Sequence, residues 1–225
     1  MQVPKNMDFP TSASIPEAWL TAYQLLFKVA EAKKGETALV LAAASGVGSC
    51  LLQLCKFAGI DAIAVSSCPE KLKICKDLGA FDGINYKQVP EFSERVKLIT
   101  DGAGADIILD PVMASMFDCN LDSLAMDGRW VIYGFMGGPK VSEANFMKLL
   151  LKRGQIKTTT LRSRTDEYKS ELIRDMLEFC TPGFESGALA PLVDRQFPMS
   201  KASEAMDIMQ QNLNIGKIVL INDLH

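Results

Sequence analysis

A buried strand, a turn of small residues and a helix are predicted within one short segment, residues 37–59, which reads TALVLAAASGVGSCLLQLCKFAG. The apolar run over 37–42 predicts the strand, and the spacing of apolar residues over 48–57 predicts the helix. Gly59 is expected to end that helix, because glycine readily adopts the left-handed conformation found at helix ends. Small residues at such a strand-to-helix turn most often let a group with phosphates lie close to the backbone.

Strand-like and helix-like segments continue to alternate after this unit. The apolar runs are continuous rather than alternating with polar residues, which is typical of a parallel sheet that helices cover on both faces. The sequence therefore predicts an α/β fold with a doubly wound parallel sheet, the architecture of a Rossmann domain. The other strands are expected at 60–66, 83–86, 105–110, within 127–134 and at 155–161, and the other helices at 16–32, 69–78, 91–100, 115–125 and 145–152.

The alternation stops after Leu161. Helices are predicted at 166–180 and 201–211, but the segments around them do not extend the sheet pattern. We therefore expect residues 16–162 to form the sheet domain and residues 163–225 to belong to a second, smaller unit. Residues 1–15 are expected to be an extended lead-in that contains proline.

The composition argues against several classes of protein. Of the 225 residues 48% are hydrophobic, which is enough for a globular core. The net charge is −3 and the basic residues are dispersed, so nucleic-acid binding has little support. No apolar run reaches the roughly 18 residues of a membrane helix, and the first ten residues lack the apolar core of a signal peptide. The cytoplasm is the expected location.

The cysteines and the histidine argue against a metal site and against nucleophilic triads. The sequence has a single histidine, His225, at its last position, which removes a Ser–His–Asp or Cys–His arrangement. No C-x-x-C pair occurs, so a zinc site is not expected. The six thiols are expected to be buried and reduced; they are Cys50, Cys55, Cys68, Cys75, Cys119 and Cys180.

The turn at residues 43–48, AASGVG, is the first candidate binding element. In a Rossmann unit the turn after the first strand opens a helix whose free N–H groups and dipole bind a pyrophosphate. The turn does not match G-x-G-x-x-G, and the alternative is a tight turn whose small residues serve packing. A Walker loop is excluded, because no Gly-Lys-Ser/Thr follows.

The end of the second predicted strand favours NADP(H) over NAD(H). Enzymes that prefer NAD place an acidic residue about 20 residues beyond the glycine turn, where it binds the ribose 2′-hydroxyl. Here Ser66 and Ser67 occupy that place and Lys71 follows, whereas Asp61 lies at the opposite end of the strand. Hydroxyls and an ammonium would accept a 2′-phosphate that a carboxylate would repel. The alternative for Lys71 is an ordinary solvated residue of a helix.

Three further features lie at the carboxyl ends of predicted strands, where ligands bind in open sheets. Tyr86 is expected either to border the adenosine or to be a partly buried aromatic. Asp110 is expected either to lie at the cofactor edge or to cap a turn. The glycines of YGFMGG, residues 133–138, would let the backbone pass close to a flat ring such as nicotinamide, or they form a simple loop.

Taken in order, several segments resemble the zinc-independent quinone oxidoreductases of the medium-chain dehydrogenase/reductase superfamily. These segments are IPEAWLTAYQLL, AASGVGSCLLQLCKFAG, EKLKICKDLGA, INYK, LDSLAMDGRWVIYGFMGG, KLLLKRG, LRSR and NIGKIVL. They span nearly the whole chain, and their combination is specific although single pieces are not. The nearest likeness is to the tumour-suppressor-induced quinone oxidoreductase group, which is related to zeta-crystallin.

The resemblance implies NADPH-dependent enzymes that reduce quinones or other electron-poor carbonyl or enone compounds. It also assigns a set of cofactor contacts to this sequence. The pyrophosphate would touch Ser45, Gly46, Val47 and Gly48. The 2′-phosphate and adenosine would be surrounded by Ser67, Lys71 and Tyr86. The nicotinamide would lie near Thr21, Tyr133, Gly134, Phe135 and Met136, and the cofactor would be closed over by Asn214, Gly216 and Lys217.

The resemblance further implies a two-domain enzyme and a homodimer that joins its sheets edge to edge, through the strand after the YG turn. Residues 163–225 would be the C-terminal part of a GroES-like catalytic domain, and most of the N-terminal part of that domain is expected to be missing from this chain. Pro111 and Met113 depart from the family's pattern, which has a glycine-containing turn there.

Three functions are compatible with these features. The first is an NADPH-dependent reductase of quinones or enones, in which the cofactor supplies the hydride and no catalytic side chain is assigned. The second is an NADPH-binding module without turnover, because one wall of the cleft would be absent. The third is an enoyl-thioester reductase. Steady-state oxidation of NADPH with ortho-quinones and with an enoyl thioester would separate them.

Overall fold

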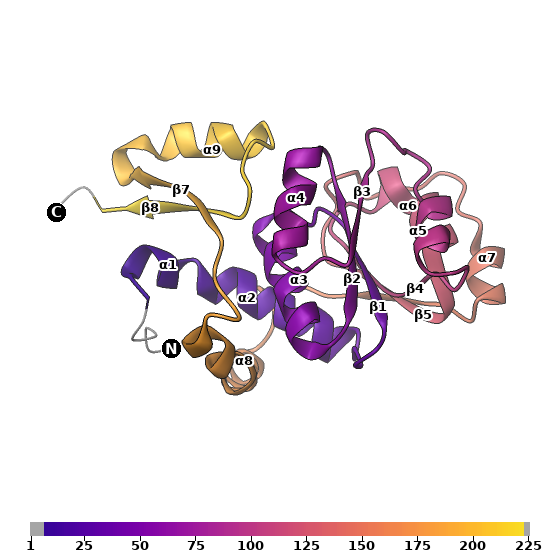
Figure 1. Ribbon diagram of the computed structural model, residues 1–225, viewed down its shortest axis with the longest axis horizontal. Helices are drawn as coiled ribbons and strands as arrows, with labels where there is room; N and C mark the ends of the chain where they lie inside the picture. The colour runs from indigo at the N-terminus through magenta and orange to yellow at the C-terminus, as the bar shows by residue number, and fades with distance from the viewer. Residues whose placement is uncertain (1–6, 223–225) are drawn as a thin grey trace.

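The computed structural model describes residues 7–222, in which a six-stranded parallel sheet lies between two layers of helices (Figure 1). The strand order is β3-β2-β1-β4-β5-β6, so the chain reverses direction across the sheet between β1 and β4. This topology confirms the predicted doubly wound α/β fold of the Rossmann type. The strands are β1 (Thr37–Val40), β2 (Asp61–Ser66), β3 (Asp82–Asn85), β4 (Ala105–Asp110), β5 (Leu124–Ile132) and β6 (Gln155–Thr158).

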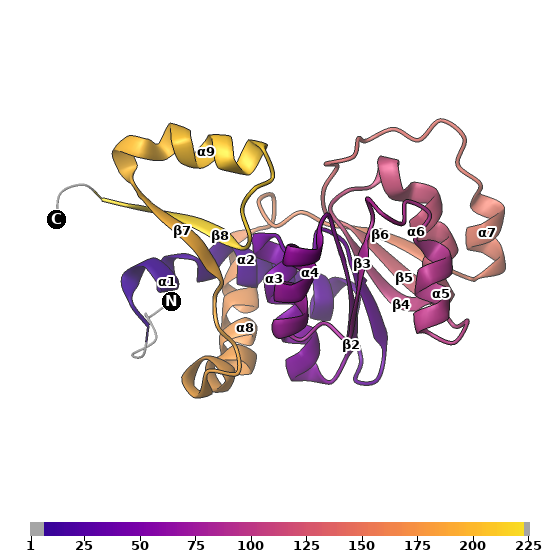
Figure 2. The same cartoon turned by 45° about the horizontal axis from the view of Figure 1, so that its top comes forward.

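The two faces of the sheet bury two separate hydrophobic clusters. Alternate residues of β1 show this division, since Ala38 and Val40 belong to one cluster and Leu39 belongs to the other. The first cluster packs under α2, α3, α4 and α8, and the second under α5 and α6. These helices are α2 (Ile15–Tyr23), α3 (Gly46–Ala58), α4 (Pro69–Asp77), α5 (Ser93–Ile99), α6 (Phe117–Ser123) and α8 (Asp166–Ser186), while α7 (Phe146–Leu151) lies beside the β6 end of the sheet (Figure 2).

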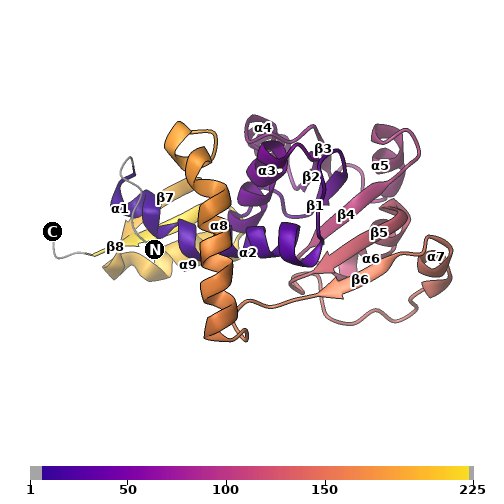
Figure 3. The same cartoon turned by 90° about the horizontal axis from the view of Figure 1, so that it is seen from below.

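The chain after β6 returns to the first face of the sheet. Helix α8 crosses α2 there, as Figure 3 shows, and the Trp19 and Phe184 rings meet edge to face with centroids 4.8 Å apart. The following segment is fastened to α3 by the buried side chain of Gln53, which donates to the Ala190 carbonyl and accepts from the Ala190 N–H, at 2.9 and 2.8 Å. The chain then forms a small parallel sheet of β7 (Val193–Pro198) and β8 (Lys217–Ile221), joined by α9 (Ala202–Gln210).

Several local predictions are wrong. The helix predicted at 115–125 ends at Ser123, where β5 follows, and the strand predicted at 155–161 ends at Thr158. The expected extended lead-in contains a helix, α1 (Phe9–Ala13), because the Asp8 carboxylate caps it by accepting from the Thr11 N–H at 2.9 Å. The helix predicted at 166–180 continues through Pro182 to Ser186 and ends at Gly187, which has a φ of 78°. Residues 1–6 of the lead-in and His225 lie outside the described part of the chain. Among residues 7–222 no helix is long and apolar enough to cross a membrane.

Candidate cofactor site

The turn between β1 and α3 brings the N-terminus of α3 to the carboxyl edge of the sheet. Ser45 is the N-cap of the helix, and its hydroxyl accepts from the Gly48 N–H at 3.1 Å. Gly48 is buried against the preceding turn, where a Cβ would lie 2.5 Å from the Ala42 carbonyl oxygen. Only glycine therefore lets α3 begin this close to β1. The positive end of the 13-residue helix faces open space above the sheet.

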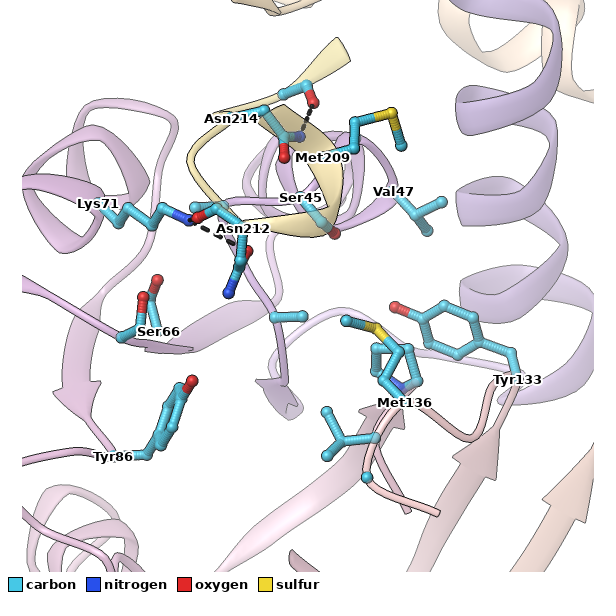
Figure 4. Close-up of a pocket in the computed structure, with 18 of the residues that line it drawn as sticks. Ser45, Val47, Ser66, Lys71, Tyr86, Tyr133, Met136, Met209, Asn212 and Asn214 are labelled. Carbon is cyan, nitrogen blue, oxygen red and sulfur yellow. Dashed lines mark hydrogen bonds between the residues drawn. The ribbon is translucent and has the colours of Figure 1, made fainter. Parts of the chain in front are cut away.

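That space is a cavity of about 560 Å³ that runs along the carboxyl ends of five parallel strands (Figure 4). It crosses the point between β1 and β4 where the strand order reverses, which is where doubly wound folds bind dinucleotides. Eleven of the predicted cofactor residues line it. They are Ser45, Gly46, Val47, Ser67, Lys71, Tyr86, Tyr133, Met136, Asn214, Gly216 and Lys217.

One end of the cavity is polar and holds a buried cation. Lys71 projects from the first turn of α4 and is only 8% exposed, beside Ser66 and Ser67 at the end of β2. Its ammonium donates to the carbonyl oxygen of Asn212 at 2.7 Å and to the Asn212 Oδ1 at 3.2 Å. Within residues 7–222 Lys71 forms no ion pair with a carboxylate, and both of its hydrogen-bond acceptors are uncharged oxygens. A buried positive charge that only neutral oxygens satisfy is suited to bind an anion.

The other end of the cavity is mostly apolar. Pro111, Val112 and Met136 line it, and Tyr133 extends from the segment after β5. The Tyr133 hydroxyl is buried and has no hydrogen-bond partner among the described residues. Burial, followed by the nearby Asp110 and Cys50, raises the pKa of this phenol, so it is protonated at neutral pH. A flat apolar ring could pack against these side chains.

Asp110 lies beneath the cavity rather than in its lining. Its Oδ1 accepts from the Val112 and Met113 N–H groups at 2.6 and 3.0 Å, and its Oδ2 accepts from the Asn120 amide and the Trp130 indole at 2.9 Å each. Burial raises the pKa of this carboxyl, although the four donors act in the opposite direction. Both carboxylate oxygens are therefore occupied by hydrogen bonds within the protein. Of the two roles that the sequence allowed, the structure gives Asp110 that of capping a turn.

The segment 212–217 after α9 covers the end of the cavity at the N-terminus of α3. The Gly216 N–H donates to the Ala44 carbonyl at 2.8 Å, and Gly216 forms a parallel bridge with Ser45. The aliphatic part of Lys217 lies over Gly46, and its ammonium is 3.6 Å from the Glu17 carboxylate. The smaller unit, by which we now mean β7, α9, β8 and the segment 212–217 between them, thus contacts the glycine turn directly.

The cavity differs in part from the predicted set. Besides Asp110, four predicted contacts do not line it: Thr21, Gly48, Gly134 and Phe135. Conversely, Met209 and Asn212 line it and were not predicted. Asn212 has a φ of 55°, and an asparagine directly after the helix predicted at 201–211 was a signal for such a left-handed helix end.

The thiols do not form a metal site in the described part of the chain. The six cysteines are free, and five are buried, whereas Cys68 is half-buried. Burial raises the pKa of Cys55, Cys75 and Cys180 to about 12, so these thiols are protonated. Within residues 7–222 no group of three or more His, Cys, Asp or Glu side chains could hold a metal ion, so these residues do not supply a zinc site.

Known dehydrogenases and reductases resemble this chain in sequence and in fold. The profile of a family described as zinc-binding dehydrogenase matches residues 46–178. A quinone oxidoreductase of Rattus norvegicus is 26% identical over 97% of this chain and 64% of its own. A highly reducing polyketide synthase of a fungal species is 27% identical over 99% of this chain and 9% of its own. A mycobacterial protein solved with NADPH is 30% identical with a TM-score of 0.86, over 98% of this chain and 66% of its own. The chain thus spans less than two thirds of the length of each of these proteins.

Substitution by alanine is expected to destabilise the protein to different degrees at the two glycines of the turn. In Gly48→Ala the new Cβ would meet the backbone oxygens of Ala42 and Ala43, which cannot move without shifting the turn. In Gly46→Ala it would meet Cδ of Lys217, the flexible part of a side chain. We expect Gly48→Ala to lower the free energy of unfolding by about 1–3 kcal/mol, the usual cost of overpacking, and Gly46→Ala to lower it much less. Urea unfolding of both variants measures this, and equal losses would contradict it.

Proposed function

This chain belongs to the zinc-binding dehydrogenase family, and we propose that its cavity binds NADPH for the reduction of quinones or other electron-poor carbonyl or enone compounds. When bound, NADPH supplies the hydride, and the protein binds, orients and shields the reactants. The buried Lys71, whose charge no carboxylate within residues 7–222 neutralises, is the observation that carries this proposal.

The 2′-phosphate of the cofactor is proposed to bind at Lys71. A buried ammonium is stable only when its charge meets strong acceptors, and phosphate oxygens are stronger acceptors than the amide oxygens that it contacts now. The hydroxyls of Ser66 and Ser67 lie beside it and would donate to the same phosphate. NADH has no phosphate at this position, so the polar end of the cavity, at Lys71, Ser66 and Ser67, favours NADPH.

The pyrophosphate is proposed to lie at the N-terminus of α3. Ser45, Gly46 and Val47 line the cavity there, and the first N–H groups of a helix have no partners within the helix. The aliphatic stem of Lys217 covers Gly46, while its ammonium is 3.6 Å from the Glu17 carboxylate. The dinucleotide would thus extend from Lys71 past the helix end toward the apolar corner.

The nicotinamide is proposed to lie at the apolar end of the cavity. Pro111, Val112 and Met136 would contact the ring and exclude water from it, which protects a hydride donor from side reactions. The neighbouring Tyr133 hydroxyl is protonated and buried, and it has no hydrogen-bond partner among the described residues. These residues orient the ring, and the acceptor would approach from the open side of the cavity.

Reduction of an enoyl thioester is a second candidate function. It is favoured by the similarity to a highly reducing polyketide synthase, which extends over 99% of this chain. The same cavity would serve it, because the reaction again takes a hydride from NADPH to an electron-poor double bond. The narrower likeness to the tumour-suppressor-induced quinone oxidoreductase group favours the first function and stays a prediction.

A homodimer joined through the β6 edge is proposed as the assembly. β6 pairs only with β5 among the described strands, so its outer edge is free to pair with a second copy. Helix α7 beside it exposes four apolar side chains, of which Leu150 and Leu151 are 71% and 69% exposed. An edge pairing of this kind would be isologous and closed, and it would cover part of that apolar surface.

Removal of the Lys71 charge is expected to weaken NADPH binding selectively. In Lys71→Met the loss of charge-assisted hydrogen bonds to the phosphate, about 1.5–3 kcal/mol, predicts a roughly 10- to 100-fold weaker NADPH affinity. NADH affinity is expected to stay within about twofold, because NADH has no group at this corner. Fluorescence titration measures both constants. Lys73→Met, which removes an exposed lysine of the same helix, is the control, and equal weakening of both cofactors in Lys71→Met would overturn the assignment.

Turnover assays distinguish the candidate functions. We expect the purified chain to oxidise NADPH faster with an ortho-quinone than with an enoyl thioester at equal concentration. The reverse order would favour the second function. Tight NADPH binding without turnover of either acceptor would instead make this chain a cofactor-binding module.

The assembly is tested by light scattering at micromolar concentration. A mass of twice the chain's 24.6 kDa is expected, and Leu150→Lys is expected to shift it toward the monomer. Phe81→Lys is the matched control, since Phe81 is 63% exposed and directly precedes β3, the strand at the opposite edge of the sheet. A monomeric wild-type chain would contradict the proposal.

A further inference from the structure

The contact between Lys71 and Asn212 joins the two parts of the protein across the cavity. Lys71 belongs to the first turn of α4, and Asn212 lies 141 residues later, just after α9 of the smaller unit. Two hydrogen bonds connect them, at 2.7 Å to the Asn212 carbonyl and 3.2 Å to its side-chain Oδ1, and Figure 4 draws them as dashed lines. Asn212 is exposed, whereas the lysine that it contacts is buried.

Asn212 contacts the Lys71 ammonium with both its backbone carbonyl oxygen and its side-chain Oδ1, and it does so from a left-handed backbone conformation. Its φ of 55° is in the left-handed region, which asparagine adopts more readily than most residues. The Asn212 N–H donates to the Met209 carbonyl at 3.0 Å, so the residue directly follows the last turn of α9. The negative end of the α9 dipole therefore also lies toward the ammonium.

Asn212 satisfies the ammonium without neutralising it. A lysine ammonium has three N–H donors, and Asn212 accepts from two of them. A third donor is left for a ligand, and the Asn212 side chain is exposed. A carboxylate at the same place would instead form an ion pair with Lys71 and would repel an approaching phosphate.

We propose that Asn212 is a positioning residue whose backbone carbonyl holds Lys71 and whose lack of charge preserves the preference of the site for NADPH over NADH. As a neutral acceptor it holds the Lys71 ammonium at the polar corner of the cavity and leaves its positive charge available to the 2′-phosphate. This inference rests on the proposed NADPH site and adds a residue of the smaller unit to it. The smaller unit thereby takes part in choosing the cofactor.

The substitution Asn212→Asp tests the charge while keeping size and backbone preference. We expect it to weaken NADPH affinity about tenfold or more and to change NADH affinity less than about twofold, since only NADPH carries a group that meets Lys71. Fluorescence titration of the full chain with each cofactor gives the ratio. Gln211→Glu is the matched control, because it adds the same charge at an exposed neighbour for which the structure gives no contact with Lys71.

A second, neutral variant shows whether the absence of a negative charge at position 212 determines the preference for NADPH. Asn212→Gly keeps the carbonyl oxygen and tolerates the positive φ, so it is expected to keep the wild-type ratio within about twofold. The proposal is overturned if Asn212→Asp keeps the NADPH preference, if it weakens both cofactors equally, or if Asn212→Gly loses the preference to the same degree. A wild-type chain that binds NADPH and NADH equally would overturn the proposed function itself, which separates the two failures.

Discussion

The close approach of α3 to the end of β1 is the constraint on which the rest of the site depends. Gly48 is packed against the backbone of Ala42 and Ala43, so the helix begins directly at the sheet edge. This places the positive end of the α3 dipole at the point where the strand order reverses. The segment that bears Gly216 then hydrogen-bonds to the same turn and closes the cavity over it. The proposed pyrophosphate site and the attachment of the smaller unit thus share one local geometry.

A buried positive charge makes one end of the cavity chemically different from the other. Lys71 is more than nine-tenths buried, yet within residues 7–222 its partners are neutral oxygens, and the opposite end of the cavity is apolar. A ligand that fits both ends must carry an anionic group at one end and a flat apolar group at the other. NADPH has this polarity, and the intervening pyrophosphate would meet the end of α3.

The sequence predicted the sheet well because continuous apolar runs and glycine-bounded helices are local signals. It placed the strand at 105–110 with the bounds of β4 and identified Gly59 as the end of α3. It could not decide the role of Asp110, because two of its donors, Asn120 and Trp130, lie 10 and 20 positions away and only the fold brings them to it. It also missed Asn212, whose contact with Lys71 exists only once the smaller unit packs on the first.

The central claim is that the polar corner of the cavity recognises a 2′-phosphate. Calorimetric titration of the wild-type chain with adenosine 2′,5′-bisphosphate and with adenosine 5′-monophosphate tests it most directly, because the two ligands differ only in that phosphate. The account predicts that the bisphosphate binds about tenfold or more tightly and that added salt weakens it more. Equal affinities for the two nucleotides would contradict it.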